Sequence, residues 1–536
     1  MVSSADELAS KAGAQMIEQG GNAIDAAIAA QMVLNVVEPH SSGIGGGGFM
    51  LYYNAKTGKS VYFNGRETAP AASYSTMFLN KNGQARDFTD VVRGGLSVAT
   101  PGLLKMLKEA HDKYGKLPWA MLFEPAIDAA RKGFTINERM QSLSTHISYL
   151  KDFDEAAEIY LKDGKPRQVG ETIANPKLAA TLENIASEGI DSFYKGRIAH
   201  DIIAAVRGSK INPGKLNLYD LNHYQVKSGD LICSTYRVKY KVCSMPVPSS
   251  GGIALLQTLG ILENFDLAKL KPNSKEAVHL IIEASRLAYA DRSEYVADIS
   301  NVPTTQMLDK LYLRSRAQLI RESRAISKVV PGKFANSEIV AKKFSKSKSN
   351  EPPSTTHISI VDEDGNAVSL TSSIEYFFGS ALSVDGFMLN NQLTDFSLTP
   401  YANGKYVANR LRPNTQPRSS LTPTFVFDQN DKLLLTLGSP GGPRIIQFTL
   451  KTILNYIDWQ MNIQEAISAP NFVALNGEVE LEKNTEVAKL KESLEALGHN
   501  VKVIDLVSGI HAVSIEGRQN LSGGADPRRG GVALGQ

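Results

Sequence analysis

The spacing of apolar residues divides the chain into a helical part and a strand-rich part. In the first 37 residues and again from about 100 to 330, apolar residues recur every three or four positions, which is typical of helices with one buried face. The pattern predicts two N-terminal helices, the first capped by Ser4 and ended by Gly20-Gly21, the second over Ala23–Val37. Further helices are predicted over Leu103–Tyr114, Pro176–Ser187 with Asn175 as its cap, and Glu276–Ala290.

Strand patterns dominate the chain after residue 355. Thr356–Val361 and Ala367–Ser373 flank a turn at 362–366, which lacks the ligand spacing of a calcium loop. A helix-rich first part followed by a hairpin-rich second part predicts an α+β fold, with helices packed against antiparallel sheets. Other strands are predicted over Phe49–Asn54, Ser60–Asn64, Leu231–Lys239, Lys241–Met245, Thr424–Phe427, Lys432–Leu437 and Ile510–Ile515, the last followed by a turn at 516–518.

A polar, basic segment at 331–354 separates the two parts. It contains a run of lysines and ends in Pro352-Pro353-Ser354, and it has too few apolar residues to bury. This composition favours a solvated linker over a nucleic-acid patch. Ser345 and Lys348 match S-x-x-K, but nothing in such a segment would hold their geometry. The linker marks a change in composition and need not separate independent domains.

Charge and hydropathy narrow the class of protein. The 536 residues include 58 basic and 55 acidic side chains, and a net charge of +3 gives no general attraction to nucleic acid or anionic membranes. No segment approaches the roughly 18 apolar residues of a membrane helix, since Gln31 and Asn35 interrupt Ala26–Val37. No signal peptide is visible. The sequence opens directly at a predicted helix, so an export segment could precede it, and the compartment stays open.

The chain has two cysteines, Cys233 and Cys243, on two predicted neighbouring strands. Two thiols are too few for a disulfide framework or a zinc site. The sequence therefore favours two unlinked core thiols, although one disulfide across the hairpin stays open.

Candidate chemistry is concentrated around Thr355, where the linker meets the first strand of the second part. In one interpretation Thr355 begins an ordinary strand. In the other, its hydroxyl attacks the carbonyl of Ser354, cleaves the chain and frees an α-amine that can serve as the base for the same hydroxyl. The reference pKa of such an amine, about 7.7–8.0, suits a general base at neutral pH. His357 is interpreted as a supporting core residue rather than a base.

Two glycine-rich segments bear on this chemistry. The run at 43–48 has no Walker lysine after it, which favours a close-packed backbone turn over a phosphate site. Gly438-Ser439-Pro440-Gly441-Gly442 follows a predicted strand, and consecutive glycine N–H groups there could stabilise an oxyanion. Neither G-x-S-x-G nor H-E-x-x-H occurs. Taken singly, each of these motifs favours a structural role over a catalytic one.

Taken together and in order, the motifs closely resemble those of the γ-glutamyltransferase (glutathione hydrolase) family of N-terminal-nucleophile hydrolases. The resemblance extends over essentially the whole chain. It rests on Gly20–Ala27, Gly45–Met50, Arg66–Pro70, Pro248–Gly252, Thr355–His357, Asn390–Phe396, Pro417–Ser420 and Gly438–Gly442.

The resemblance implies an αββα four-layer sandwich of the N-terminal-nucleophile type, made as a precursor and cut before Thr355. It implies a large subunit of residues 1–354 and a small subunit of 355–536, intertwined as one globular unit. Thr355 would be the nucleophile, and Gly441 and Gly442 would supply oxyanion donors. Ser373 stands where the family usually has a threonine beside the nucleophile, so a hydroxyl is retained. The resemblance also implies that the protein is periplasmic or secreted.

The resemblance also implies how the glutamyl end of a substrate would be held. An α-carboxylate needs a cation and hydroxyls, and an α-ammonium needs acceptors. Arg66, Ser419 and Ser420 match the carboxylate clamp of the family, and Gln392 and Asp395 match its ammonium clamp.

Glu375 departs from the family pattern, because better-known members have asparagine there. Some of those members carry Glu at the position of Gln392, so our hypothesis is that the two roles are exchanged and the total charge is kept. If Glu375 points away, the site would prefer another acyl group, as in related cephalosporin or glutaryl acylases. The loop at 397–416 is shorter than the lid of some members, which favours hydrolysis, and Tyr401 or Tyr406 could act as a gate.

The predicted function is γ-glutamyl transfer to water, or to an amino acid or peptide, from glutathione and related compounds. The alternatives are the same machinery acting on a cephalosporin, glutaryl or polyglutamate amide, and an uncleaved non-catalytic binding protein. Neither a metal nor an organic cofactor is suggested.

Overall fold

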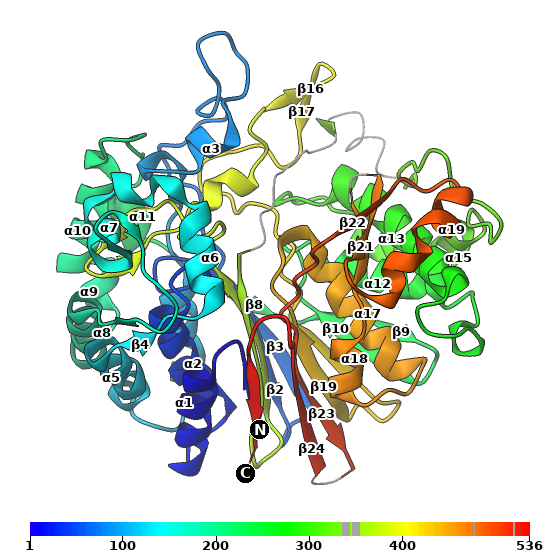
Figure 1. The fold of residues 1–536 in the computed structure, drawn as a ribbon, viewed down its shortest axis with the longest axis horizontal. Helices are drawn as coiled ribbons and strands as arrows, with labels where there is room; N and C mark the ends of the chain where they lie inside the picture. Colours follow the sequence, from blue (N-terminus) through cyan, green and yellow to red (C-terminus); the bar gives the residue numbers. More distant parts are fainter. Residues whose placement is uncertain (335–343, 346–353, 476, 518–519, 536) are drawn as a thin grey trace.

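Two antiparallel sheets form the centre of the molecule, with helices on both outer sides (Figure 1). The structure is a computed structural model and describes residues 1–334, 344–345, 354–475, 477–517 and 520–535. The first sheet has the strand order β25 (Val532–Leu534), β1 (Val2–Ser4), β12 (Thr356–Val361), β13 (Ala367–Ser373), β2 (Gly47–Asn54), β3 (Lys59–Asn64) and β8 (Lys227–Gly229). The second has the order β24 (Asn520–Ala525), β23 (His511–Glu516), β19 (Leu433–Gly438), β18 (Thr424–Phe427), β10 (Tyr240–Ser244) and β9 (Ile232–Tyr236).

The alternation of residues along β12 explains the layering. Ile358 and Ile360 face the helices on one side, while Val361 packs with residues of the second sheet. Polar residues between the sheets are hydrogen-bonded, since Ser359 Oγ donates to the carbonyl oxygen of His511 (3.0 Å). The helices against the first sheet include α1 (Glu7–Glu18), α2 (Ala23–Val37), α4 (Leu103–Tyr114), α5 (Glu124–Lys132) and α8 (Pro176–Glu188). Those against the second include α12 (Gly251–Leu262), α13 (Lys275–Tyr295), α17 (Ile445–Ile457) and α18 (Ile463–Ser468).

This arrangement of helix, sheet, sheet and helix confirms the predicted α+β fold class and the four-layer sandwich. The helix α2 forms over the predicted residues and is buried along its whole length. Within the described ranges, every helix falls short of the length and apolar character that crossing a bilayer requires.

The predicted cap of the first helix is wrong. Ser4 lies in β1, and Asp6 caps α1 by accepting a hydrogen bond from the N–H of Leu8 (2.8 Å). Val2–Ser4 pairs with β12 on one side and with β25 on the other. These pairings with distant strands place Ser4 inside the sheet, whereas a capping serine would lie outside it. Asn175, in contrast, caps α8 as predicted.

Strands from before and after the linker interleave in both sheets. In the first sheet β1 lies between β25 and β12, and in the second β10 lies beside β18. The two parts therefore share both sheets and cannot be separate domains. Most of the predicted linker, 335–343 and 346–353, lies outside the described residues, as do Lys348 of the S-x-x-K match and Arg518 of the last predicted turn. Phe344–Ser345 forms β11, which pairs with β17 (Lys405–Val407).

The glycine run at 43–48 packs against the backbone, as predicted. A Cβ atom at Gly45 would lie 2.1 Å from the carbonyl oxygen of Met388, and one at Gly46 would lie 2.2 Å from that of Ser373. Only glycine permits this approach, because side-chain atoms elsewhere never come so close to a backbone oxygen. The run brings the start of β2 against the end of β13, where Ser373 lies.

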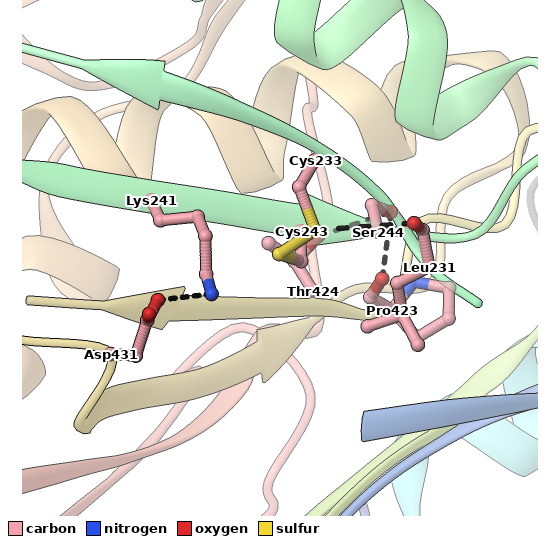
Figure 2. The surroundings of a disulfide bond; sticks show 8 residues. All are labelled: Leu231, Cys233, Lys241, Cys243, Ser244, Pro423, Thr424 and Asp431. Carbon is pink, nitrogen blue, oxygen red and sulfur yellow. Dashed lines mark hydrogen bonds and ion pairs between the residues drawn. A yellow bond between two sulfur atoms is a disulfide. The ribbon is translucent and has the colours of Figure 1, made fainter. Parts of the chain in front are cut away.

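The two cysteines form a disulfide, so the favoured prediction of unlinked thiols is wrong. Cys233 of β9 lies directly opposite Cys243 of β10, and Figure 2 shows the sulfur atoms joined across the hairpin. Opposite residues on antiparallel strands are close enough to be bridged. The sequence could not decide this, because a shift of one residue in register would have placed the cysteines on opposite faces.

We expect Cys233→Ser to lower stability without abolishing folding. The bridge closes a short loop, so its loss should cost about 2 to 3 kcal/mol, mainly by releasing the unfolded chain. Calorimetry should show a lower unfolding midpoint for the variant, and reduction of the wild-type protein should reproduce the shift. An unchanged midpoint in both experiments would contradict a stabilising bridge.

Candidate active site

Thr355 lies at the point where the chain enters β12, and it is almost completely buried. Its Oγ1 contacts the carbonyl oxygen of the preceding residue, Ser354, and lies 3.3 Å from Ser373 Oγ. The Ser373 hydroxyl donates to the same Ser354 carbonyl oxygen (2.9 Å). A hydroxyl thus lies against the carbonyl that it would attack, and a second hydroxyl donates to the oxygen on which charge would develop.

The segments on both sides of the Ser354–Thr355 bond are fixed by further hydrogen bonds. Ser354 Oγ donates to the carbonyl oxygen of His40 (2.7 Å), and Arg529 Nη1 donates to that of Thr355 (2.9 Å). Arg529 is separated from Thr355 by 174 positions. No local pattern in the sequence indicates this contact, and sequence reasoning missed it.

A single pocket of about 270 Å³ opens at Thr355. It brings together nine of the ten predicted site residues, all except Gly441. It also includes Ser354, whose carbonyl is the predicted point of self-cleavage, and Leu421 and Ile445, which the sequence did not single out. The predicted residues that line it are Arg66, Thr355, Ser373, Glu375, Gln392, Asp395, Ser419, Ser420 and Gly442.

Carboxylates and an amide line one side of this pocket. Asp395 Oδ2 accepts a hydrogen bond from Gln392 Nε2 (2.6 Å), and Glu375 Oε2 accepts one from Asn391 Nδ2. Glu375 has a positive φ of 81°, uncommon outside glycine, and its side chain reaches the pocket rather than pointing away. Burial, and then the neighbouring charge of Asp395, raise the pKa of Glu375 well above its ordinary value. Two carboxyl groups that meet in a buried pocket cannot both ionise easily.

Arg66 extends into the same pocket from the segment that follows β3. Its Nη2 forms an ion pair with Asp395 (2.5 Å) and donates to the carbonyl oxygen of Arg418 (3.3 Å). The predicted clamps for opposite charges therefore touch each other across the pocket. Glu67 lies behind Arg66, with 3.7 Å between Nη1 and Oε2. Burial raises the pKa of Glu67 to about 7.

The serine pair forms the remaining polar wall. Ser419 Oγ accepts a hydrogen bond from the N–H of Leu421 (3.1 Å), and Ser420 Oγ accepts one from Arg292 Nη2 (2.5 Å). Arg292 lies on α13 and has no motif of its own in the sequence, so only the fold brings it to this wall. The wall thus contains two hydroxyls, and a buried arginine contacts one of them.

The glycine turn after β19 places Gly442 in the pocket wall. Gly441 and Gly442 have φ values of 133° and 59°, so the turn uses backbone conformations that side chains disfavour. A Cβ atom at Gly441 would lie 2.8 Å from the ring of Phe448. Gly441 is next to the pocket rather than part of its wall, and its role as an oxyanion donor stays a prediction.

His357 is a buried core residue, as predicted. Its Nδ1 lies 2.8 Å from Thr371 Oγ1 and its Nε2 lies 3.0 Å from Ser359 Oγ. Burial lowers the pKa of the His357 imidazole well below its ordinary value, which favours the neutral ring. Tyr401 and Tyr406 lie on an exposed hairpin, β16 (Tyr401–Ala402) and β17, with ring centroids 4.5 Å apart, and they do not line the pocket.

Among the described residues, no group of three or more His, Cys, Asp or Glu side chains could hold a metal ion.

Comparison with known proteins identifies the family. The family model for Gamma-glutamyltranspeptidase matches residues 9–536. The chain is 37% identical over 545 residues to the glutathione hydrolase proenzyme of Bacillus subtilis (strain 168), covering 100% of this chain and 91% of that protein. It is 38% identical over 543 residues to the glutathione hydrolase proenzyme of Escherichia coli (strain K12), covering 98% of this chain and 90% of that protein.

The fold is also that of a related acylase. The crystal structure of cephalosporin acylase from Bacillus halodurans has a TM-score of 0.85 and 28% sequence identity, covering 99% of this chain and 94% of that chain. The family match and the two hydrolase relatives extend over nearly the whole sequence and confirm the resemblance drawn from the motifs. The chain is a hydrolase or transferase of the γ-glutamyltranspeptidase family.

Proposed function

We propose that this enzyme cleaves itself before Thr355 and then transfers γ-glutamyl groups from amides to water or to an amine. The observation that carries the proposal is the single pocket in which Thr355 meets groups suited to both charges of a glutamyl end. Glutathione and other γ-glutamyl compounds are the proposed donors, and an amino acid or peptide is the proposed amine acceptor.

Self-cleavage would begin with attack of Thr355 Oγ1 on the carbonyl carbon of Ser354. The C–N bond breaks as the new C–O bond forms, and the Thr355 nitrogen takes up a proton, which leaves an ester between Ser354 and Thr355. Water then hydrolyses the ester, giving a carboxylate at Ser354 and a free hydroxyl and amine at Thr355. The Ser373 hydroxyl supports the first step, because it donates to the oxygen that becomes negative.

We expect Ser373→Ala to slow self-cleavage roughly 10-fold to 100-fold, since a donor to the developing oxyanion is lost. A time course on denaturing gels should show the intact chain persisting, and Ser373→Thr should restore the rate because it returns a hydroxyl. Normal cleavage of Ser373→Ala would remove Ser373 from this role.

The second reaction uses the same atoms on a substrate. The freed amine of Thr355 takes the proton from its hydroxyl, and Oγ1 attacks the γ-carbonyl carbon to form an ester to the enzyme. The amide C–N bond breaks, and its nitrogen leaves with a proton. Water or an amine then attacks the ester and releases the glutamyl group. Gly442, with Gly441 beside it, is proposed to donate N–H groups to the oxyanion.

Charge complementarity supports the glutamyl group as the acyl donor. The α-carboxylate would lie against Arg66, Ser419 and Ser420, and the α-ammonium against the carboxyl groups of Glu375 and Asp395. A glutaryl group carries the carboxylate without the ammonium. It would bring no cation to the side of the pocket where Glu375 and Asp395 lie, which disfavours the acylase alternative.

Parallel assays with a γ-glutamyl anilide and a glutaryl anilide test this choice. We expect kcat/KM to be at least about 100-fold higher for the γ-glutamyl compound, because one charged hydrogen-bonding group is worth roughly that factor. Faster turnover of the glutaryl compound would instead favour an acylase, in keeping with the similarity to cephalosporin acylase.

We also propose that the enzyme works outside the cytoplasm. The Cys233–Cys243 disulfide supports this location, because such bonds persist mainly in oxidising compartments. Fractionation of the source cells with thiol labelling should find the protein outside the cytoplasm, with neither cysteine labelled before reduction. Recovery from the cytoplasm with two free thiols would contradict the proposal.

A further inference from the structure

A second buried arginine, Arg292, lies behind the serine wall of the pocket. It is on the last turn of α13 and is 4% exposed. Its Nε donates to Ser250 Oγ (2.7 Å) and its Nη2 donates to Ser420 Oγ (2.5 Å). Its guanidinium also lies 5.4 Å from the centroid of the Tyr289 ring. The side chain is therefore held in one position by neighbours on three segments.

Ser250 extends this contact to the other serine of the wall. It lies directly before α12, and both its N–H (2.8 Å) and its hydroxyl (2.6 Å) donate to the carbonyl oxygen of Ser419. Arg292 thus contacts Ser420 directly and the backbone of Ser419 through Ser250. The helices α12 and α13 lie side by side against the second sheet, so this contact lies within the helical layer that covers that sheet (Figure 1).

The chemistry of the guanidinium fixes the orientation of the Ser420 hydroxyl. A guanidinium only donates hydrogen bonds, so Ser420 Oγ must be the acceptor toward Arg292. The single hydroxyl proton of Ser420 then points away from Arg292, and Ser420 lines the pocket. Because the donor is charged, its hydrogen bond also strengthens the hydroxyl as a donor.

The positive charge of Arg66 is already engaged by a carboxylate of the pocket. Its Nη2 is paired with Asp395 at 2.5 Å. The guanidinium of Arg292 brings a second cation to the serine wall through its contact with Ser420. Its effect is stronger in a buried pocket than it would be in water.

We propose that Arg292 is a positioning residue for recognition of the substrate's carboxylate, acting by orienting the Ser420 hydroxyl toward the pocket. This inference rests on one part of the proposed function, namely that the transferred acyl group carries a carboxylate at the end away from the attacked carbonyl. The γ-glutamyl and glutaryl groups both do so. The contact also means that a residue of the predicted large subunit sets up a binding group of the small one.

The test measures KM and kcat for Arg292→Gln with whichever of the two anilides the wild-type enzyme accepts. Loss of a charge-assisted contact should raise KM roughly 10-fold to 100-fold with less than about a threefold change in kcat. A 4-aminobutyryl anilide lacks the carboxylate, and its hydrolysis should change less than about threefold. Arg292→Lys keeps the charge but lacks the forked donors of a guanidinium, so its KM should lie between those of the wild type and Arg292→Gln.

A double-mutant cycle separates this role from general damage to the fold. In a Ser420→Ala background, Arg292→Gln should change KM less than about threefold, because the group that it orients is gone. Arg237→Gln is a matched control, since Arg237 pairs with Asp458 away from the pocket, and its KM should stay at the wild-type value. All variants are compared after complete cleavage and at matched unfolding midpoints.

Three results would overturn the inference. They are an unchanged KM for Arg292→Gln, a full additional rise in KM in the Ser420→Ala background, or an equal loss with the 4-aminobutyryl compound. Failure of the proposed function gives a different result. The wild-type enzyme would then prefer the glutaryl anilide, and Arg292→Gln would still raise KM for that carboxylate-bearing substrate.

Discussion

Thr355→Ala should remain a single 58.2 kDa chain and show no measurable acyl transfer. Alanine has no hydroxyl to attack the carbonyl of Ser354, so the chain stays whole, and no nucleophile is available for a substrate. We expect activity to fall by on the order of 10⁴-fold or more, as is usual when a covalent nucleophile is removed. A denaturing gel and the release of the anilide chromophore measure the two effects.

Thr356→Ala is the matched control for this experiment. Thr356 is the next residue and is equally buried, and its Oγ1 has no hydrogen-bond partner among the described residues. Its loss should leave both cleavage and turnover near wild-type levels. Thr355→Ser, which keeps a hydroxyl, should still cleave. Normal cleavage of Thr355→Ala would contradict the assignment of the nucleophile.

Glu375→Ala should raise KM for a γ-glutamyl anilide by roughly 10-fold to 100-fold, with a much smaller effect on kcat. The substrate's ammonium would lose a buried charged partner, whereas the acylated Thr355 would keep its own neighbours. Steady-state kinetics measure KM, and burst kinetics report the breakdown of the acyl-enzyme. An unchanged KM would show that Glu375 does not supply the negative charge that some family members place at the position of Gln392.

The same residue should make binding depend on pH. In the empty pocket, burial and the charge of Asp395 raise the pKa of Glu375 well above its ordinary value near 4.5, which favours the protonated form. A bound ammonium favours the ionised form, so substrate binding should release a proton. KM should therefore fall as pH rises through the pKa of Glu375 in the empty site. Glu375→Gln should lose this dependence, and calorimetry in buffers of different ionisation enthalpy should detect the released proton in the wild type only.

The sequence predicted the strands that bear the nucleophile because their alternation is local. The predicted bounds of β12 and β13 are those of the structure, and the hairpin turn between them follows from an acidic, glycine-containing segment. The cap at Asp6 and the disulfide were missed, because both depend on which distant strand pairs with β1 or on the register of a hairpin.

The candidate site was predictable as a set of residues and not as a geometry. Short motifs identify Arg66, Gln392 and Asp395 one by one, but the ion pair between Arg66 and Asp395 joins positions 329 apart. Arg292 and Arg529 carry no motif of their own, and only the fold brings them to Ser420 and Thr355. Contacts of this kind depend on tertiary packing, which a local pattern does not encode.

N-terminal sequencing of the purified, matured protein tests the central claim most directly. We expect two fragments that stay associated under native conditions, the smaller one beginning Thr355-Thr356-His357. A single intact polypeptide that releases γ-glutamyl groups at full rate would contradict the account, as would a small fragment that begins at any other residue.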